Sequence, residues 1–257
     1  TSRRQRQMCI RDRYFIGARI ILKRSHYIQR EEGIVMEEKK ITILKDGPYE
    51  VTGGVPLNEM RIVPNERGES AAWMKTREYP LQESYHLCRC GHSKNKPFCD
   101  GTHAKIHFDG TETAENIPYD ESCEIYEGDG MTLMDKRELC AFARFCDPNG
   151  QVWGLIEDRK NADLAVEEAC NCPAGRLTVV IDGEKAEAEL PQEISLIDDH
   201  PKGKRGPIWV RGGIPVIGSD GTRYEVRNRV TLCRCGQSRN KPFCDASHMT
   251  DPESDED

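Results

Sequence analysis

The sequence predicts an α+β protein in which two small β-rich modules flank a small α+β domain. Three observations predict this fold class. A sixteen-residue segment that begins at Cys88 returns at Cys233 with twelve identical positions. Upstream of each copy lies a β-rich run that is broken by a Gly-Gly turn, at residues 53–54 and 212–213. The interval between the copies lacks this repeat and contains helical periodicity instead.

These observations divide the chain into five parts. The modules occupy residues 36–106 and 194–250, and the domain between them occupies 107–193. Residues 1–35 are interpreted as a non-native or disordered leader, because they are Arg-rich and Gln7–Arg13 resembles translated sequencing-adapter sequence. We therefore expect the natural chain to start at Met36, although the Arg content would also suit an organellar transit peptide. Residues 251–257 are predicted to be a solvated acidic tail.

Composition narrows the class of protein. With 37% hydrophobic residues the chain is poor in material for one large core, so bound metal would supply part of the folding free energy. Six of the twelve cysteines lie in the repeated segment beside a fixed His, which favours metal ligation over disulfides and a reducing, cytoplasmic compartment. A net charge of −7 argues against a nucleic-acid partner. The apolar stretch at residues 14–22 is too short to span a membrane.

In chain order, each module should begin with β-rich residues around its Gly-Gly turn, at 47–57 and 206–216. A further strand should precede each first Cys, at 85–87 and 224–232, and residues 65–69 should form a loop. In the middle domain, Asp135 and Glu138 resemble a capping box that would start a helix running to Cys146. A second helix is predicted over 162–169, followed by a strand at 177–181 and a turn at 182–183.

The repeated segment offers three thiolates and one imidazole at the spacing C-x-C-x8-C-x3-H. Gly91 and Gly236 follow the C-x-C pairs and would let the chain turn, so that both thiolates of a pair reach one centre. The last Cys and the His are four residues apart, which would place them on one face of a helix that starts near Pro97 in the first copy. Spacing alone leaves zinc and iron–sulfur centres open. The candidate ligands are Cys88, Cys90, Cys99 and His103, and Cys233, Cys235, Cys244 and His248.

Both copies resemble the CDGSH iron–sulfur family, also called the NEET type, whose pattern C-x-C-x2-S-x3-P-x-C-D-x2-H they fill throughout. The resemblance implies one [2Fe–2S] cluster per copy, with the C-x-C pair on one iron and the last Cys with the His on the other. It also implies that the two modules pair about a pseudo-twofold axis. Structural zinc is the alternative. His86 and His92 are assigned to the surface or to packing, because Thr231 and Gln237 replace them in the second copy.

A His ligand must bind iron through a neutral nitrogen, so protons compete with the metal. We therefore predict that mild acid releases each cluster and that cluster reduction is coupled to proton uptake. Visible absorbance recorded during acidification checks the first point, with a His103→Cys/His248→Cys variant as the comparison. Equal acid sensitivity of the variant and the wild type would refute the prediction.

Four further cysteines lie in the middle domain, at Cys140, Cys146, Cys170 and Cys172. The pair Cys172-Pro173 is typical of ferredoxin ligation. Together with Cys140 and Cys146 it resembles a divergent single-cluster ferredoxin-like domain. That resemblance implies a [4Fe–4S] cluster on Cys140, Cys146, Cys172 and, as a fourth ligand, Cys170. A three-thiolate [3Fe–4S] centre, a distant ligand at Cys123, and buried packing cysteines are the alternatives.

The sequence therefore predicts an iron–sulfur redox protein that acts in electron transfer, with an unidentified redox or cluster-acceptor protein as partner and with no nucleic-acid or membrane partner. A cluster-transfer or repair protein is the first alternative, and a zinc-stabilised interaction module is the second. No nucleophile–base arrangement, phosphate-binding loop or dinucleotide fingerprint stands out, so a carrier or donor is expected rather than an enzyme.

Overall fold

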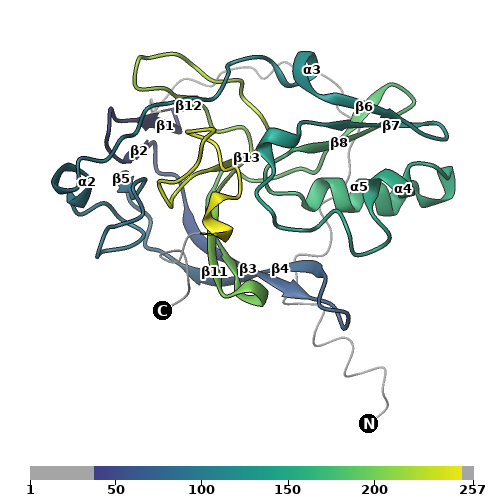
Figure 1. Ribbon diagram of the computed structural model, residues 1–257, viewed down its shortest axis with the longest axis horizontal. Coiled ribbons are helices and arrows are strands. Elements are labelled where there is room, and N and C mark those ends of the chain that lie inside the picture. Colours follow the sequence, from purple (N-terminus) through teal and green to yellow (C-terminus); the bar gives the residue numbers. More distant parts are fainter. Residues whose placement is uncertain (1–37, 251–257) are drawn as a thin grey trace, which may run out of the picture.

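The computed structural model describes residues 38–250, in which short strands are joined by loops and short helices (Figure 1). The predictions for the leader (1–35) and the tail (251–257) fall outside the described residues. The described part of the chain contains three sheets and confirms the α+β class.

The first sheet has the strand order β12-β1-β2-β5. Three of its strands come from the first module, and β12 comes from the second. Strand β1 runs parallel to β12, with Ile41 opposite Val216, and antiparallel to β2. The bounds are Lys40–Ile43 for β1, Tyr49–Thr52 for β2, Ser84–Leu87 for β5 and Val216–Ile217 for β12.

The second sheet has the order β13-β11-β10-β3-β4 and mirrors the first. Here β3 of the first module runs parallel to β10 of the second, with Leu57 opposite Ile194. Strand β4 extends this sheet beyond the repeat, after the predicted loop at 65–69. The bounds are Leu57–Pro64 for β3, Ser70–Glu78 for β4, Ile194–Asp199 for β10, Lys204–Arg211 for β11 and Arg229–Leu232 for β13.

The two modules therefore exchange strands. In each module, the strand that follows the Gly-Gly turn leaves its own sheet and pairs with the first strand of the other module. One core of buried residues from both sheets, among them Ile41, Val51, Ile194 and Val210, closes between them. This interlocked arrangement is the pseudo-twofold pairing that the sequence resemblance implied.

The middle segment forms the third sheet, of order β6-β7-β8-β9, and its helices α4 and α5 pack on β7 and β8. The longest described helix, α5, has ten residues, and none of the described helices is long and apolar enough to cross a membrane. The strand bounds are Glu124–Glu127 (β6), Met131–Asp135 (β7), Leu177–Ile181 (β8) and Glu184–Ala186 (β9). The helix bounds are Thr102–Lys105 (α2), Tyr119–Ser122 (α3), Val152–Leu155 (α4) and Ala162–Asn171 (α5), with 3-10 turns at Arg137–Leu139 (η1), Arg159–Asn161 (η2), His200–Lys202 (η3) and Ser247–Met249 (η4).

The predicted helix from Asp135 to Cys146 is wrong. Asp135 ends strand β7 and accepts two hydrogen bonds from Arg176, so it caps no helix. Residues 140–151 form a loop in which Phe142 and Arg144 have positive φ angles of 57° and 61°, which a right-handed helix cannot contain. The second predicted helix is confirmed as α5, and the strand at 177–181 is confirmed as β8.

Candidate metal centres

The first repeated segment (88–103) folds back on the strand that precedes it. The Cys88 N–H donates to the Pro97 carbonyl over 2.8 Å, and the Cys99 N–H donates to the His86 carbonyl over 2.9 Å. The second repeated segment (233–248) makes the same two bonds at Cys233 and Cys244. We call these segments the first and second ligand loops. In each loop the return bonds bring the C-x-C turn close to the last Cys.

Within each loop the candidate ligands form two close pairs. Cys88 Sγ lies 3.8 Å from Cys90 Sγ, and Cys99 Sγ lies 3.3 Å from His103 Nδ1. In the second loop, 3.6 Å separates the sulfurs of Cys233 and Cys235, and 3.5 Å separates Cys244 Sγ from His248 Nδ1. The nitrogen that faces sulfur is Nδ1 in both loops, so Nδ1 is the nitrogen placed to bind metal.

This two-plus-two arrangement differs from a single-metal site. A tetrahedral zinc with Zn–S bonds near 2.3 Å would hold all its ligand atoms about 3.8 Å apart. Among residues 38–250, no three His, Cys, Asp or Glu side chains converge closely enough to hold one metal ion. Within each pair, the two ligand atoms lie at a spacing that two ligands of one metal ion would have.

The helix that was predicted to carry both the last Cys and the His of each loop begins only after the last Cys. In the first loop α2 begins at Thr102, after Cys99, and the second loop has only the 3-10 turn η4 there. The chain instead turns through a left-handed residue, Gly101 with φ 83° or Ala246 with φ 67°. This turn aims a backbone N–H at the sulfur two residues earlier, over 3.5 Å at Cys99 and 3.4 Å at Cys244. Such bonds favour a negatively charged sulfur.

The left-handed alanine carries strain that glycine avoids, which gives a stability prediction. Ala246→Gly should stabilise the folded protein by about 1 kcal/mol, because glycine adopts positive φ without a steric penalty. The reciprocal Gly101→Ala should destabilise the folded protein by a similar amount, through its positive φ alone. An added Cβ there would meet no atom within 4 Å, so no steric clash adds to this cost. Urea unfolding of the two variants checks this. A change of the same sign in both would contradict it.

The pKa values of the two thiols in each C-x-C pair are shifted in opposite directions. The hydrogen bond with Cys90 and nearby backbone N–H groups lower the pKa of Cys88, whereas the same bond and burial raise the pKa of Cys90. Cys233 and Cys235 repeat this division. The two thiols of each pair therefore differ in acidity, and the pair loses its protons in two separate steps.

The intervening arginines are structural. Arg89 is 2% exposed and donates to the carbonyls of Leu44, Gly47 and Gly110. Arg234 in the second loop donates to the carbonyls of Ile197 and Gly206. Each guanidinium therefore ties its C-x-C turn to the preceding hairpin.

The two ligand loops lie back to back. A Cβ on Gly91 would lie 2.5 Å from the Cys235 carbonyl oxygen, and one on Gly236 would lie 2.6 Å from that of Cys90. The Tyr49 hydroxyl from the first sheet donates to the carbonyl of Cys233 over 2.8 Å. Backbone therefore touches backbone between the two candidate centres.

The loops differ in their exposure to solvent. His248 is 3% exposed, and burial lowers its pKa to about 4. His103 and Cys99 are only partly buried. In the acid titration above, the second loop should therefore keep its neutral imidazole well below the ordinary pKa of histidine.

The structure brings three of the four middle-domain cysteines together. Cys140, Cys146 and Cys172 line one small pocket, the middle pocket, with a volume of about 20 Å³. Arg176 also lines it, held by Asp135 and stacked over Trp153. Burial raises the pKa values of Cys146 and Cys172, so metal binding there has to displace thiol protons. Three thiols around a cavity beside a cation fit an anionic iron–sulfur cluster.

Cys170 and Cys123 do not line this pocket. The Cys170 sulfur lies 3.7 Å from the Ala186 carbonyl and packs against the core of the middle domain. The Cys123 sulfur lies 4.0 Å from the Asp120 carbonyl. All eleven cysteines among the described residues are free thiols.

Arg229 is a site residue that the sequence analysis missed. This side chain is 1% exposed and reaches from β13 into the middle domain. One of its nitrogens donates to the carbonyls of Ala169, Cys170 and Cys172, and the other pairs with Glu187 at 2.9 Å. The strand that leads into the second ligand loop therefore also fixes the backbone of Cys172.

Glu168 binds the loop that follows Cys146, and its pKa gives a prediction of how stability depends on pH. Its side chain accepts a hydrogen bond from the Asn149 N–H, and burial raises its pKa to about 7. Glu168 therefore keeps its proton to higher pH in the folded state than in the unfolded state. The stability that this protonated carboxyl contributes is full at low pH and is lost as the pH rises from about 4.5 to 7. Glu168→Gln should match the wild type at pH 5 and exceed its stability by about 2 kcal/mol at pH 8. Identical pH profiles in thermal unfolding would contradict this.

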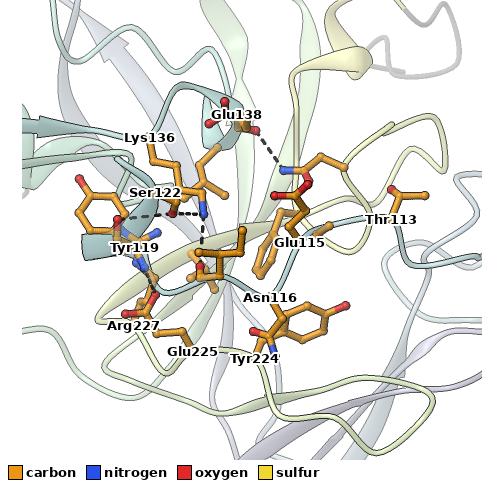
Figure 2. A pocket seen from close by; sticks show the side chains of 16 residues that line it. Thr113, Glu115, Asn116, Tyr119, Ser122, Lys136, Glu138, Tyr224, Glu225 and Arg227 are labelled. Atoms are coloured by element: carbon orange, nitrogen blue, oxygen red, sulfur yellow. Dashed lines mark hydrogen bonds between the residues drawn. The ribbon is translucent and has the colours of Figure 1, made fainter. Parts of the chain in front are cut away.

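A larger cavity of about 380 Å³ lies where the middle domain meets the second ligand loop. Figure 2 shows Lys136 and Ser122 joined by a hydrogen bond at its side, with Glu225 and Arg227 below them. Leu139 and Phe243 also line it, and each directly precedes a candidate ligand, Cys140 or Cys244. In Figure 1 the second loop, in yellow, lies between the first sheet and the middle domain.

Comparisons with known proteins agree with these sites. Residues 46–104 and 205–249 match the family described as iron-binding zinc finger CDGSH type. Residues 126–182 match the family described as divergent 4Fe-4S mono-cluster. The chain therefore contains two CDGSH-type segments and, between them, a segment that matches the divergent 4Fe-4S family. A search of curated proteins found no match. The matches cover both ligand loops and the middle pocket, so the chain is an iron–sulfur cluster-binding protein.

Proposed function

We propose that the protein transfers electrons through three iron–sulfur centres. Each CDGSH loop would hold a [2Fe–2S] cluster, with its C-x-C pair on one iron and its last Cys and His on the other. The middle pocket would hold a cubane-type cluster on Cys140, Cys146 and Cys172. When bound, such clusters supply one-electron oxidation and reduction. The two-plus-two pairing of ligand atoms in each loop supports the binuclear assignment.

The contiguity of the three sites is the observation that carries this proposal. The two CDGSH turns touch through Gly91 and Gly236. On the other side, Cys244 belongs to the same buried cluster as Leu139 and Ala141, and the charge of Cys140 acts on the Cys244 thiol. Electron exchange weakens steeply with separation, so a chain of adjoining sites suits electron transfer. The partner would be a redox protein in a reducing, cytoplasmic compartment.

Cluster donation is the second candidate, and one observation favours it. Cys99 and His103 of the first loop are partly exposed, so an acceptor protein could reach a cluster there, whereas Cys244 and His248 are buried.

Repeated reduction and reoxidation separates the two functions. An electron carrier should recover its visible spectrum and keep its iron through several cycles with dithionite and air-free oxidant. Incubation with an apo-ferredoxin should then move no iron. Transfer of iron and absorbance to the acceptor at a rate that exceeds spontaneous loss would contradict the carrier proposal and support donation.

A further inference from the structure

The middle ligand segment contains an ordinary ferredoxin spacing with one ligand replaced. Ferredoxin clusters of this type are held by C-x2-C-x2-C and a later Cys-Pro. Here the segment reads Cys140-x2-Ala143-x2-Cys146, with Cys172-Pro173 as the later pair. Ala143 therefore stands where the second thiolate would be. The structure agrees, because Ala143 lines the middle pocket together with the three cysteines.

Among the described residues that line the middle pocket, no other side chain takes over that role. Apart from the three cysteines, the residues that line the pocket are Ala, Phe, Arg, Pro and Leu, which are not iron ligands. Cys170 is close in sequence, but its sulfur contacts the Ala186 carbonyl and the apolar core. Arg229 holds the carbonyls of both Cys170 and Cys172, which fixes this orientation of the turn.

We propose that the middle centre is held by three thiolates, Cys140, Cys146 and Cys172, and leaves one iron position beside Ala143 to a small anionic ligand from outside the chain. The proposal rests on the function proposed above. Arg176 and Arg144 line the pocket, held by Asp135 and Asp199, and place two cationic groups beside such an anion, for example hydroxide or a small thiolate. Such a position would give the protein an iron that exchanges ligands as well as electrons.

Controlled oxidation of the anaerobically purified full chain tests this. Ferricyanide takes one electron, one ferrous ion leaves, and three ferric ions stay on the three thiolates. The wild type should release about one iron per chain and develop the EPR signal of a three-iron centre. Oxidised [2Fe–2S] clusters are diamagnetic, so the CDGSH loops do not contribute to that signal.

Three variants sharpen the test. Ala143→Cys supplies the missing thiolate and should suppress both the iron release and the signal, whereas Ala143→Ser, of similar size, should behave as the wild type. Cys170→Ser should keep the iron content and the release of the wild type. Loss of middle-centre iron in Cys170→Ser, full retention of iron by the oxidised wild type, or equal release from Ala143→Cys and the wild type would each overturn the proposal. An untreated wild type with only about four iron would instead refute the middle cluster itself.

Discussion

Gly91→Ala is expected to destabilise the folded protein by about 3 kcal/mol or more. The backbone at Gly91 has φ 87°, and a Cβ there would lie 2.5 Å from the carbonyl oxygen of Cys235 and 3.3 Å from its Cα. These atoms are backbone and cannot rotate away, so the two ligand loops must separate. Gly236→Ala should have the same effect, since its Cβ would meet the Cys90 carbonyl at 2.6 Å.

Gly101→Ala is the matched control, because Gly101 has a similar φ of 83° but open space around it. Gly101→Ala should destabilise the folded protein only through the strain of a positive φ angle, by about 1 kcal/mol. Chemical unfolding of the three variants measures the difference. If Gly91→Ala and Gly101→Ala unfold at the same denaturant concentration, the two turns do not touch as described.

Arg229→Gln is expected to empty the middle pocket while both CDGSH centres persist. The substitution frees the carbonyls of Ala169, Cys170 and Cys172, and it leaves Glu187 without its buried partner. Removing one member of a buried ion pair costs about 3–5 kcal/mol. Because Cys172 is then no longer held, we expect the iron content to fall by about four per chain, the iron of one cubane cluster.

Arg159→Gln is the control, since Arg159 also pairs with a carboxylate of the middle domain, Asp182, but on the exposed surface. It should change neither the iron content nor the stability measurably. Arg229→Lys keeps the charge opposite Glu187 and should recover part of the stability. Iron analysis and EPR of the reduced protein check these outcomes. Wild-type iron in Arg229→Gln would show that the contact does not position the ligand.

The repeat predicted much of the two modules but not their strand exchange. Alternating apolar residues mark a strand and the face it buries, yet they do not say which strand lies beside it. The runs at 47–57 and 206–216 therefore predicted β-rich segments, while the parallel pairs β1–β12 and β3–β10 needed the structure. The C-x-C turns were foreseen from Gly91 and Gly236, because only their positive φ angles bring each thiol pair together.

The middle segment was predicted less well for two physical reasons. The spacing of Leu139, Phe142, Ala143 and Cys146 imitates a helix, but Phe145 stacks on Trp73 of the second sheet at 4.5 Å and Ala143 packs beside it, which pulls the segment into a loop. Arg229 was missed because a charged residue in a strand usually faces water. The available signal was its place directly before Val230, in a run that is otherwise apolar or Thr up to Cys233.

Analysis of iron, zinc and acid-labile sulfide in the purified protein tests the central claim most directly. Two binuclear centres and one cubane predict about eight iron and about eight sulfide per chain, with iron falling to about seven where the fourth position has been lost. Zinc should be negligible. Two or more zinc per chain without sulfide would contradict the account, because the ligand pairs would then hold single metal ions.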